Sequence, residues 1–282
     1  MQKKSLSALP LGIYEKAICN FLSWPEKLAL ARDSGFDCVE MSIDGTEERL
    51  CRLYDNGQTV REVNEAIRNT GVPFYTMALT ANRAFPLGSE EEKIRNKGLE
   101  LVERAIALSA ETGIKLIHLA GYDDHGEKCN ERTDELFHES VARVDKMAEG
   151  SGVRLAIETM DTLYMGSCRR IVKLLGEVGT KNMGVYADTG NLTALGFVPA
   201  DEIKAAGELI LGAHVKDATP GVMRDVVFGE GIVDFDAAFK AFEDIGYQGA
   251  FIAEMWSYDK ESFHPMLRQA SAFIRNKLAK FN

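Results

Sequence analysis

The strongest constraint on the fold is the regular alternation of short apolar runs with longer amphipathic segments along the chain. Each apolar run has the length and composition of a β-strand, and each following segment has helical periodicity. The predicted strands cover residues 11–14, 37–43, 72–79, 115–121, 153–158, 183–188, 210–215 and 249–255. The predicted helices cover residues 23–35, 59–71, 89–113, 133–152, 167–179, 199–209, 234–246 and 262–280.

Eight strand–helix units predict an α/β fold in which residues 1–282 form a single (β/α)8 TIM barrel domain. The later strands are nearly continuous apolar runs, as expected of strands that are buried on both faces. An open doubly wound sheet is the structural alternative, but that fold usually carries a glycine-rich turn after its first strand. The corresponding turn here, YEKAICNF, contains no glycine. At the start of the helix over 89–113, Ser89 and Glu92 have the spacing of a capping box.

The composition and charge of the chain argue against several classes of protein. The net charge is −10, from 33 basic and 43 acidic residues, which argues against a nucleic-acid binder because such proteins usually carry a basic excess. No apolar run approaches the roughly 18 residues that a membrane helix needs. The N-terminal stretch MQKKSLSALPLGIY does not read as a signal peptide. The five cysteines form no C-x-x-C pair, which is typical of reduced thiols in a cytoplasmic protein.

Four of the predicted strands end in a polar residue that directly follows apolar neighbours. These residues are Glu158 in LAIE, Asp188 in VYAD, His214 in GAHV and Glu254 in FIAE. Taken singly, such a carboxylate is often the cap of the next helix, and a lone histidine is often a hydrogen-bonded core residue. In a (β/α)8 barrel, however, the carboxyl ends of the strands converge on one mouth. The four side chains are therefore expected to meet.

Three carboxylates gathered beside an apolar core would repel one another and would be poorly solvated. A divalent cation resolves both problems, and three carboxylates with one imidazole suit Mn²⁺, Zn²⁺, Co²⁺ or Mg²⁺. The absence of thiolate ligands from this set argues against a closed structural zinc site. The sequence therefore predicts one divalent ion held by Glu158, Asp188, His214 and Glu254.

The same pattern resembles that of the xylose-isomerase-like barrels, a superfamily of metal-dependent sugar isomerases and epimerases that also includes a DNA-repair endonuclease. Within it, the chain is most similar to the L-ribulose-5-phosphate 3-epimerases, also called L-xylulose-5-phosphate 3-epimerases, of bacterial ascorbate and pentose catabolism. The resemblance covers nearly the whole chain. It is carried by LGIYEKA, LSWPEKLALARDSGFDCVEMSID, FPLGS, LAGYD, ETMDT, DTGNL, HVKD, RDVVFGEG and GAFIAEMW.

The resemblance implies proton transfer at C3 of a ketopentose 5-phosphate through an enediolate that a metal ion, most simply Zn²⁺ or Mn²⁺, stabilises. Glu158 and Glu254 correspond to the two glutamates that exchange the proton in related ketose 3-epimerases and that also bind the metal. Asp188 and His214 would serve only as ligands. Which glutamate removes the proton would depend on which epimer is bound.

Further residues are expected around the substrate. Arg224 corresponds to an arginine that contacts substrate oxygens in relatives, Trp256 is expected to form an apolar wall, and Asp217 is expected to orient His214 or Lys216. Glu230 is a weaker site candidate. The expected substrate-binding set is Arg224, His118, Arg83, Asn82, Lys16 and Trp256.

Three alternatives stay open at this point. The first is another sugar isomerase, or a ketose 3-epimerase for an unphosphorylated sugar, because the loop after the strand over 72–79 departs from the family pattern at Asn82 and Ala84. The second is a repair nuclease, which would need more histidines than the five present and a less acidic chain. The third is a non-catalytic sugar-binding barrel. The superfamily also implies a homodimer.

Overall fold

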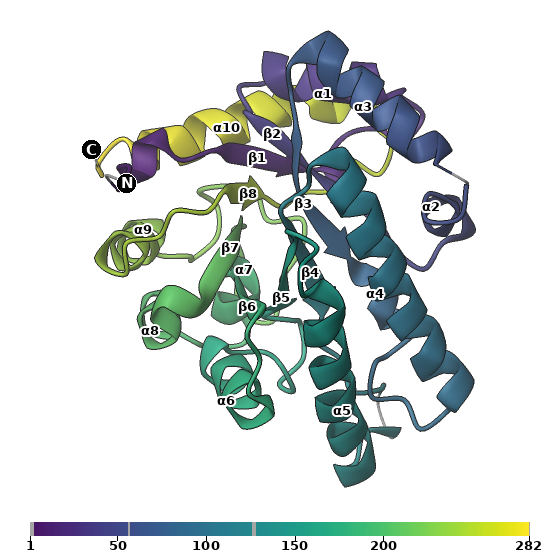
Figure 1. Cartoon of the computed structure of the whole chain (residues 1–282). Coiled ribbons are helices and arrows are strands. Elements are labelled where there is room, and N and C mark those ends of the chain that lie inside the picture. The colour runs from purple at the N-terminus through teal and green to yellow at the C-terminus, as the bar shows by residue number, and fades with distance from the viewer. Residues whose placement is uncertain (1–2, 56, 126–127, 282) are drawn as a thin grey trace.

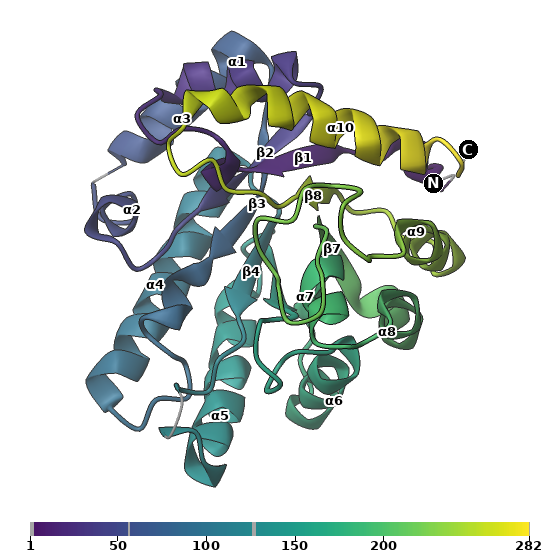
Figure 2. The ribbon, with the colours of Figure 1, turned by 180° about the vertical axis from the view of Figure 1, so that it is seen from behind.

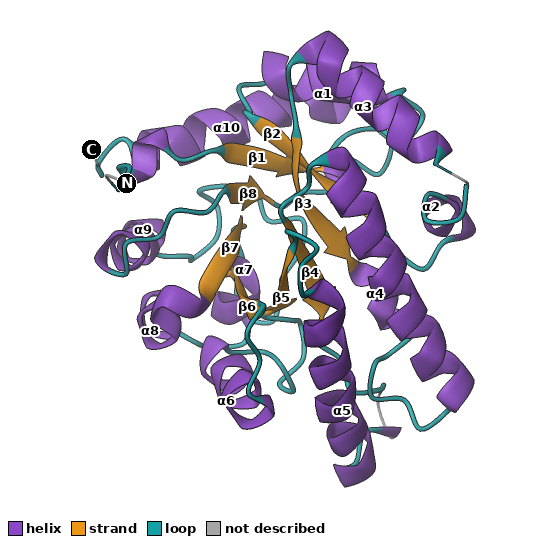
Figure 3. Ribbon diagram, viewed as in Figure 1, coloured by secondary structure: helices purple, strands orange, loops and turns teal. Residues whose placement is uncertain are grey.

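The computed structural model describes residues 3–55, 57–125 and 128–281, and in this part of the chain parallel strands close into a barrel in the order β1 to β8. Pairing of β1 with both β2 and β8 completes the ring. Figure 3 shows the strands as an inner ring with helices outside it. The strands are β1 (Leu11–Tyr14), β2 (Cys38–Ser42), β3 (Phe74–Leu79), β4 (Leu116–Ala120), β5 (Arg154–Glu158), β6 (Met183–Asp188), β7 (Ile210–Val215) and β8 (Phe251–Ala253).

The longer helices cover the outside of the barrel (Figure 1), and all of them except the last lie between consecutive strands in the chain. The α-helices are α1 (Trp24–Asp33), α2 (Glu47–Cys51), α3 (Gln58–Thr70), α4 (Glu92–Thr112), α5 (Glu131–Ala148), α6 (Cys168–Val178), α7 (Thr189–Ala194), α8 (Pro199–Ala206), α9 (Phe235–Asp244) and α10 (His264–Leu278). Short 3-10 helices are η1 (Leu6–Ala8), η2 (Glu15–Ala17), η3 (Thr80–Arg83), η5 (Gly207–Leu209) and η6 (Glu261–Phe263). In Figures 1 and 2 the start of the described chain lies beside the end of α10.

The apolar composition of the strands follows from their position between two packed layers. Every residue of β1, β2, β4 and β6 is buried, because one face of each strand meets the helices and the other meets the barrel interior. The helices contribute one apolar stripe each; in α6 the buried side chains include Ile171, Leu174 and Leu175. The core therefore forms mainly between the strands and the surrounding helices, and the barrel interior is left for polar groups near its mouth.

The predicted (β/α)8 barrel is confirmed, with each strand in its predicted place along the chain. The short helices α2 and α7 were not predicted, because five or six residues are too few to show a helical period. The predicted capping box at Ser89 is wrong: α4 begins at Glu92, and the buried Ser89 hydroxyl has no hydrogen-bond partner among the described residues. Strand β8 is shorter than predicted, so Glu254 lies just beyond its end.

Two further expectations concern the whole chain. All five cysteines are free thiols, and Cys19, Cys38 and Cys168 are buried. Within the described ranges, none of the helices combines the length and the apolarity needed to cross a membrane.

Candidate active site

The four strand-end residues meet at the mouth of the barrel. The Nδ1 atom of His214 lies 2.9 Å from Glu158 Oε1, 3.6 Å from Asp188 Oδ2 and 3.8 Å from Glu254 Oε2. One ligand atom from each residue can be chosen so that all four lie within 4.8 Å of one another. All four side chains are almost completely buried, with at most 10% of a side chain exposed. The structure thus brings together the set that the sequence singled out.

Asp188 explains why β6 ends in a carboxylate. Its Oδ1 atom accepts hydrogen bonds of 2.8 Å from the backbone N–H groups of Gly190 and Asn191, and so caps the short helix α7. Its Oδ2 atom is buried, takes no part in this cap and lies 2.9 Å from the ammonium group of Lys216. One oxygen therefore has the structural role of a helix cap, while the other faces the cluster.

Lys216, which follows β7, is the cation nearest to the four residues. Its ammonium group lies 2.9 Å from Asp188 Oδ2 and 2.5 Å from Glu254 Oε2, and it also donates to Asn191 Oδ1. Burial would lower the pKa of Lys216, but Asp188 and Glu254 raise it above its ordinary value, so the lysine stays charged. The sequence predicted a contact of Lys216 with Asp217 only. It did not predict that the Lys216 ammonium lies among the four strand-end residues.

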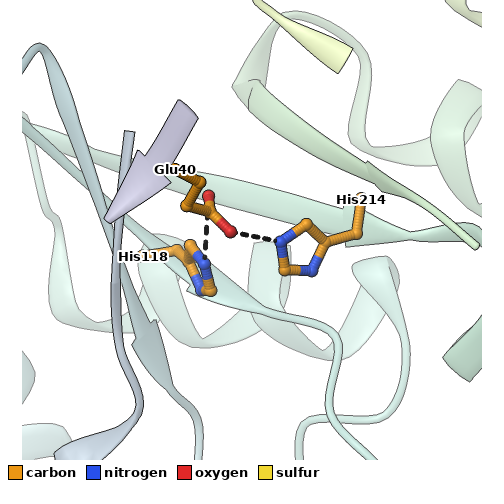
Figure 4. A group of neighbouring side chains, drawn as sticks. All are labelled: Glu40, His118 and His214. Carbon is orange, nitrogen blue, oxygen red and sulfur yellow. Dashed lines mark hydrogen bonds and ion pairs between the residues drawn. The ribbon is translucent and has the colours of Figure 1, made fainter. Parts of the chain in front are cut away.

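Glu40, in the middle of β2, is a further carboxylate that sequence reasoning missed. It is completely buried and accepts a 2.6 Å hydrogen bond from His214 Nε2. His118, from β4, lies 3.4 Å from Glu40 and 3.3 Å from Glu158, although neither ring nitrogen has hydrogen-bond geometry. Figure 4 shows Glu40 between the two imidazoles. The available signal was a charged residue inside the apolar run DCVEMSI.

The surroundings of the cluster shift the pKa values of its residues in different directions. Burial alone would raise the pKa of Glu158, but His118 and His214 hold it well below its ordinary value. Glu254 differs, because burial raises its pKa above the ordinary value and Lys216 offsets this only in part. Burial would lower the pKa of His118, yet Glu40 and Glu158 raise it to about 9. The two glutamates proposed to exchange a proton thus have different environments.

A pocket of about 440 Å³ opens over the cluster. This volume suits a small polar ligand such as a sugar. Glu158 and Glu254 both lie in its wall, as do Lys16, Arg83, Arg224 and Trp256 from the expected substrate-binding set. The remaining lining residues are Tyr14, Asp44, Gly45, Thr46, Thr80, Ala84, Met160, Asp161, Asn191, Lys216 and Met223.

The cations of the pocket wall differ in their partners. Lys16 pairs with Asp44 at 2.5 Å, and Arg83 is bound to both Tyr122 and Asp161. The guanidinium of Arg224 lies 5.0 Å from the centre of the Trp256 ring, and no carboxylate of the described residues forms an ion pair with it. Arg224 is therefore the pocket cation whose charge is least neutralised.

Four residues that were expected at the substrate site or next to its ligands lie elsewhere or have other partners. Asn82 is completely buried and, like His118, does not line the pocket. Glu230 is exposed and also lies outside it. The expectation for Asp217 is wrong: its carboxylate accepts hydrogen bonds from the backbone of Ala218, Gly229, Gly231 and Val233. Asp217 thus fixes the loop between β7 and α9, and does not bind His214 or Lys216.

The donor set fits a divalent cation. Imidazole and carboxylate groups both bind Zn²⁺, and carboxylate oxygens suit Mn²⁺ and Mg²⁺. The ligand atoms are close enough to reach one ion, and Asp188 Oδ2 is a buried oxygen that is paired with the Lys216 ammonium and faces the other three ligands. The arrangement suits one divalent ion and leaves the identity of that ion open.

Comparison with known proteins identifies the family of the chain. Residues 28–277 match the family model described as xylose isomerase-like TIM barrel. The chain is 40% identical over 273 residues to the L-ribulose-5-phosphate 3-epimerase UlaE of Escherichia coli O157:H7 (strain EC4115 / EHEC), and the match covers 96% of each chain.

Solved structures share the fold at lower identity. One is described as the structure of L-ribulose 3-epimerase; it has a TM-score of 0.79 at 19% identity and covers 96% of this chain and 95% of its own. Another is the IolI protein with a bound zinc atom, with a TM-score of 0.77 at 18% identity and coverage of 97% and 99%. These two likenesses show a common barrel.

Proposed function

The chain belongs to the xylose isomerase-like TIM barrel family and, within it, to the L-ribulose-5-phosphate 3-epimerases, and on this premise we propose that it inverts C3 of a ketopentose 5-phosphate. Its class is that of an isomerase, a carbohydrate epimerase. The substrates we propose are L-ribulose 5-phosphate and L-xylulose 5-phosphate. The single observation that carries the chemistry is the convergence of Glu158, Asp188, His214 and Glu254 at one side of the pocket.

We propose that these four residues hold one divalent ion. A bound ion would act as a Lewis acid toward the ketose carbonyl at C2, and would thereby acidify the proton on the neighbouring C3. The protein supplies the anionic ligands in a buried site, where their interaction with a cation is stronger than in water. We propose that the ion is Zn²⁺, Mn²⁺, Co²⁺ or Mg²⁺.

Inversion at C3 requires one group to remove a proton from one face and another group to return a proton to the opposite face. Glu158 and Glu254 are the carboxylates that suit this pair of roles, because both line the pocket and they come from β5 and from the end of β8. These strands are not neighbours in the barrel. We propose that the two carboxylates approach a bound sugar from different sides. Their roles exchange when the reaction runs backwards.

The phosphate of the substrate needs a cation, and Arg224 is the best candidate. Lys16 and Arg83 already have carboxylate partners, whereas Arg224 contacts the face of Trp256 and forms no ion pair with a carboxylate among the described residues. A guanidinium can form two parallel hydrogen bonds to a phosphate group. We propose that Arg224 binds the phosphate or an adjacent substrate oxygen, while Trp256 forms the apolar wall beside it.

The proposal is tested by assaying the purified protein with L-ribulose 5-phosphate before and after treatment with a chelator, and after each ion is restored. Activity should disappear with the chelator and return with at least one of the four ions. Glu158→Gln and Glu254→Gln should each lose activity by two or more orders of magnitude, since each removes one proton-transfer group. Unchanged turnover in the stripped protein would refute the metal-dependent mechanism.

Metal content provides a second test that does not depend on the sugar. Wild type should hold one ion per chain by mass spectrometry, and Asp188→Ala should hold much less. Equal occupancy in both would show that Asp188 is no ligand. Unphosphorylated L-ribulose should be assayed in parallel, because preference for it would favour the alternative of a ketose 3-epimerase for free sugars.

Two further expectations remain proposals. We propose that residues 1–282 act as a single domain and that the chain forms a homodimer. Light scattering of the purified protein, coupled to size-exclusion chromatography, measures the mass directly. A mass near twice 31.2 kDa is expected for the dimer.

A further inference from the structure

The side chain of Glu40 is the centre of a buried hydrogen-bond network inside the barrel. It lies on β2 and is completely buried. Its Oε1 atom accepts a hydrogen bond of 2.6 Å from His214, and its Oε2 atom accepts hydrogen bonds of 2.7 Å from Thr76 and 2.8 Å from Tyr186. Three donors from three other strands therefore fix the position of this carboxylate.

Tyr186 reaches Glu40 across the barrel because β7 provides room for its ring. A Cβ atom placed on Gly212 would lie 2.4 Å from Cε2 of Tyr186, so a side chain at this position would displace the ring. The hydroxyl of Tyr186 is completely buried and donates to Glu40. The anchoring of Glu40 is thus built into the packing of the barrel as well as into its polar groups.

The two nitrogens of His214 face different carboxylates. Nε2 faces Glu40, whereas Nδ1 faces the cluster, 2.9 Å from Glu158 and 3.6 Å from Asp188. Figure 4 shows the bond from Nε2 to Glu40, with the rest of the ring turned away from that carboxylate. A histidine that binds a metal through one nitrogen commonly donates its other N–H to a carboxylate, which fixes the tautomer and the ring orientation.

We propose that Glu40 is a positioning residue for the metal ligand His214: by accepting the proton of Nε2, it directs the lone pair of Nδ1 toward the ion shared with Glu158, Asp188 and Glu254. This inference rests on the ion site of the proposed function and is independent of the sugar. Glu40 touches neither the substrate pocket nor the proposed ion, so its effect is transmitted through the imidazole of His214.

A second ion bound by Glu40, His118 and His214 is the rival explanation, because their ligand atoms also lie within 4.8 Å of one another. The separation of 2.6 Å between His214 Nε2 and Glu40 Oε1 is that of a short hydrogen bond. The other oxygen of Glu40 already accepts two hydroxyl protons. The geometry therefore favours a positioning role over a second site.

Glu40→Gln is the most informative variant because glutamine has nearly the same shape. If its amide N–H faced Nε2, the imidazole would have to carry its proton on Nδ1 and could not bind the ion. If its carbonyl faced Nε2, the tautomer would be kept but the negative charge would be lost. In either case the affinity for Zn²⁺ should fall about 10- to 100-fold.

The matched control is Glu202→Gln. Glu202 is also a buried glutamate, with 3% of its surface exposed, but it pairs with Arg169 outside the site. Its Zn²⁺ affinity should equal that of wild type. Titration of the three stripped proteins with Zn²⁺ gives affinity and stoichiometry, and one ion per chain is expected in each.

The tautomer is read directly from two-bond proton–nitrogen NMR correlations of the zinc-loaded wild type, with the His214 signals identified by their loss in His214→Asn. The expected spectrum places the proton of His214 on Nε2 and the zinc on Nδ1. This readout decides the question even if Glu40→Gln does not fold.

Three results would overturn the inference. These are a proton on Nδ1 in the zinc-loaded wild type, an unchanged Zn²⁺ affinity in Glu40→Gln, and two ions in wild type with one in Glu40→Gln. Failure of the wild type to bind any ion would instead remove the proposed ion site, and the inference with it. The wild-type titration thus separates the two kinds of failure.

Discussion

Lys216 Nζ lies 2.9 Å from Asp188 Oδ2, the same oxygen that faces the proposed ion. The lysine also contacts Glu254, so one buried ammonium group is paired with two of the four proposed ligands. A lysine with 5% of its surface exposed has few water molecules to replace these contacts. Lys216 and a divalent ion therefore interact with the same carboxylates, and each should change the influence of the other.

Lys216→Met should make the protein more dependent on bound metal. Removing one member of a buried ion pair costs about 3–5 kcal/mol, because the remaining charge stays buried without a partner. The variant should therefore melt at a lower temperature than wild type in the presence of a chelator, and Mn²⁺ or Zn²⁺ should raise its melting temperature by more than they raise that of wild type. Lys128→Met is the control, since Lys128 is exposed and pairs with Glu91. Equal metal-induced shifts in wild type and Lys216→Met would contradict this account.

Arg224→Ala should weaken the binding of the phosphorylated substrate more than that of the free sugar. A hydrogen bond to a charged group contributes about 1.5–3 kcal/mol, which corresponds to roughly a 10- to 100-fold rise in KM for L-ribulose 5-phosphate. The rise for unphosphorylated L-ribulose should be smaller. Steady-state kinetics with both sugars measure the ratio, and Arg132→Ala, an exposed arginine on α5, serves as the control. The same factor for both sugars would place Arg224 away from the phosphate.

Glu15, beside the barrel mouth, is a structural carboxylate whose loss should be costly. It is completely buried and pairs with Lys27 at 2.8 Å, Arg49 at 2.6 Å and Arg52 at 2.8 Å. Glu15→Gln leaves these three buried cations without their shared carboxylate, so we expect a loss of about 3–5 kcal/mol in the free energy of unfolding.

Thermal or urea denaturation measures this loss. The matched control is Glu100→Gln, because Glu100 also bridges two cations, Lys97 and Arg104, but its side chain is 38% exposed. Its cost should stay within about 1 kcal/mol. Similar losses for the two variants would show that the burial of the Glu15 cluster does not matter.

The same cluster predicts a pH dependence. Burial would raise the pKa of Glu15, but Arg52, Arg49 and Lys27 hold it well below the ordinary value of 4.5. A carboxyl group whose pKa is lower in the folded protein stabilises the fold above its unfolded pKa, and this contribution is lost as the pH falls toward its folded pKa. The stability difference between wild type and Glu15→Gln should be constant at neutral pH and should shrink progressively below pH 4.5. A difference that grew on acidification would have the wrong sign.

The barrel and the four clustered residues could be predicted because each depends on a local signal. Strands buried on both faces are apolar throughout, so a polar residue such as Asp188 at the end of one is conspicuous. The capping role of Asp188 and its place in the cluster were treated as alternatives, yet its two oxygens fulfil both. One side chain can therefore cap a helix and also belong to a cluster of potential metal ligands.

The remaining features depend on distances that only the folded chain defines. Glu40 lies in the middle of its strand. A search for polar residues at the ends of strands therefore does not find it. The partners of Lys16 and Arg83, which are Asp44 and Asp161, belong to other loops, so their pairing could not be read from spacing. The bonds of Asp217 to the backbone of its loop likewise appear only once the loop is folded.

The most direct test of the central claim is proton NMR of L-ribulose 5-phosphate incubated in D₂O with the metal-loaded protein. We expect deuterium at C3 together with the appearance of L-xylulose 5-phosphate, and neither change with the stripped protein. Deuterium at C1, or epimerisation that continues after the metal is removed, would contradict the claim that a metal ion held at the barrel mouth supports proton exchange at C3.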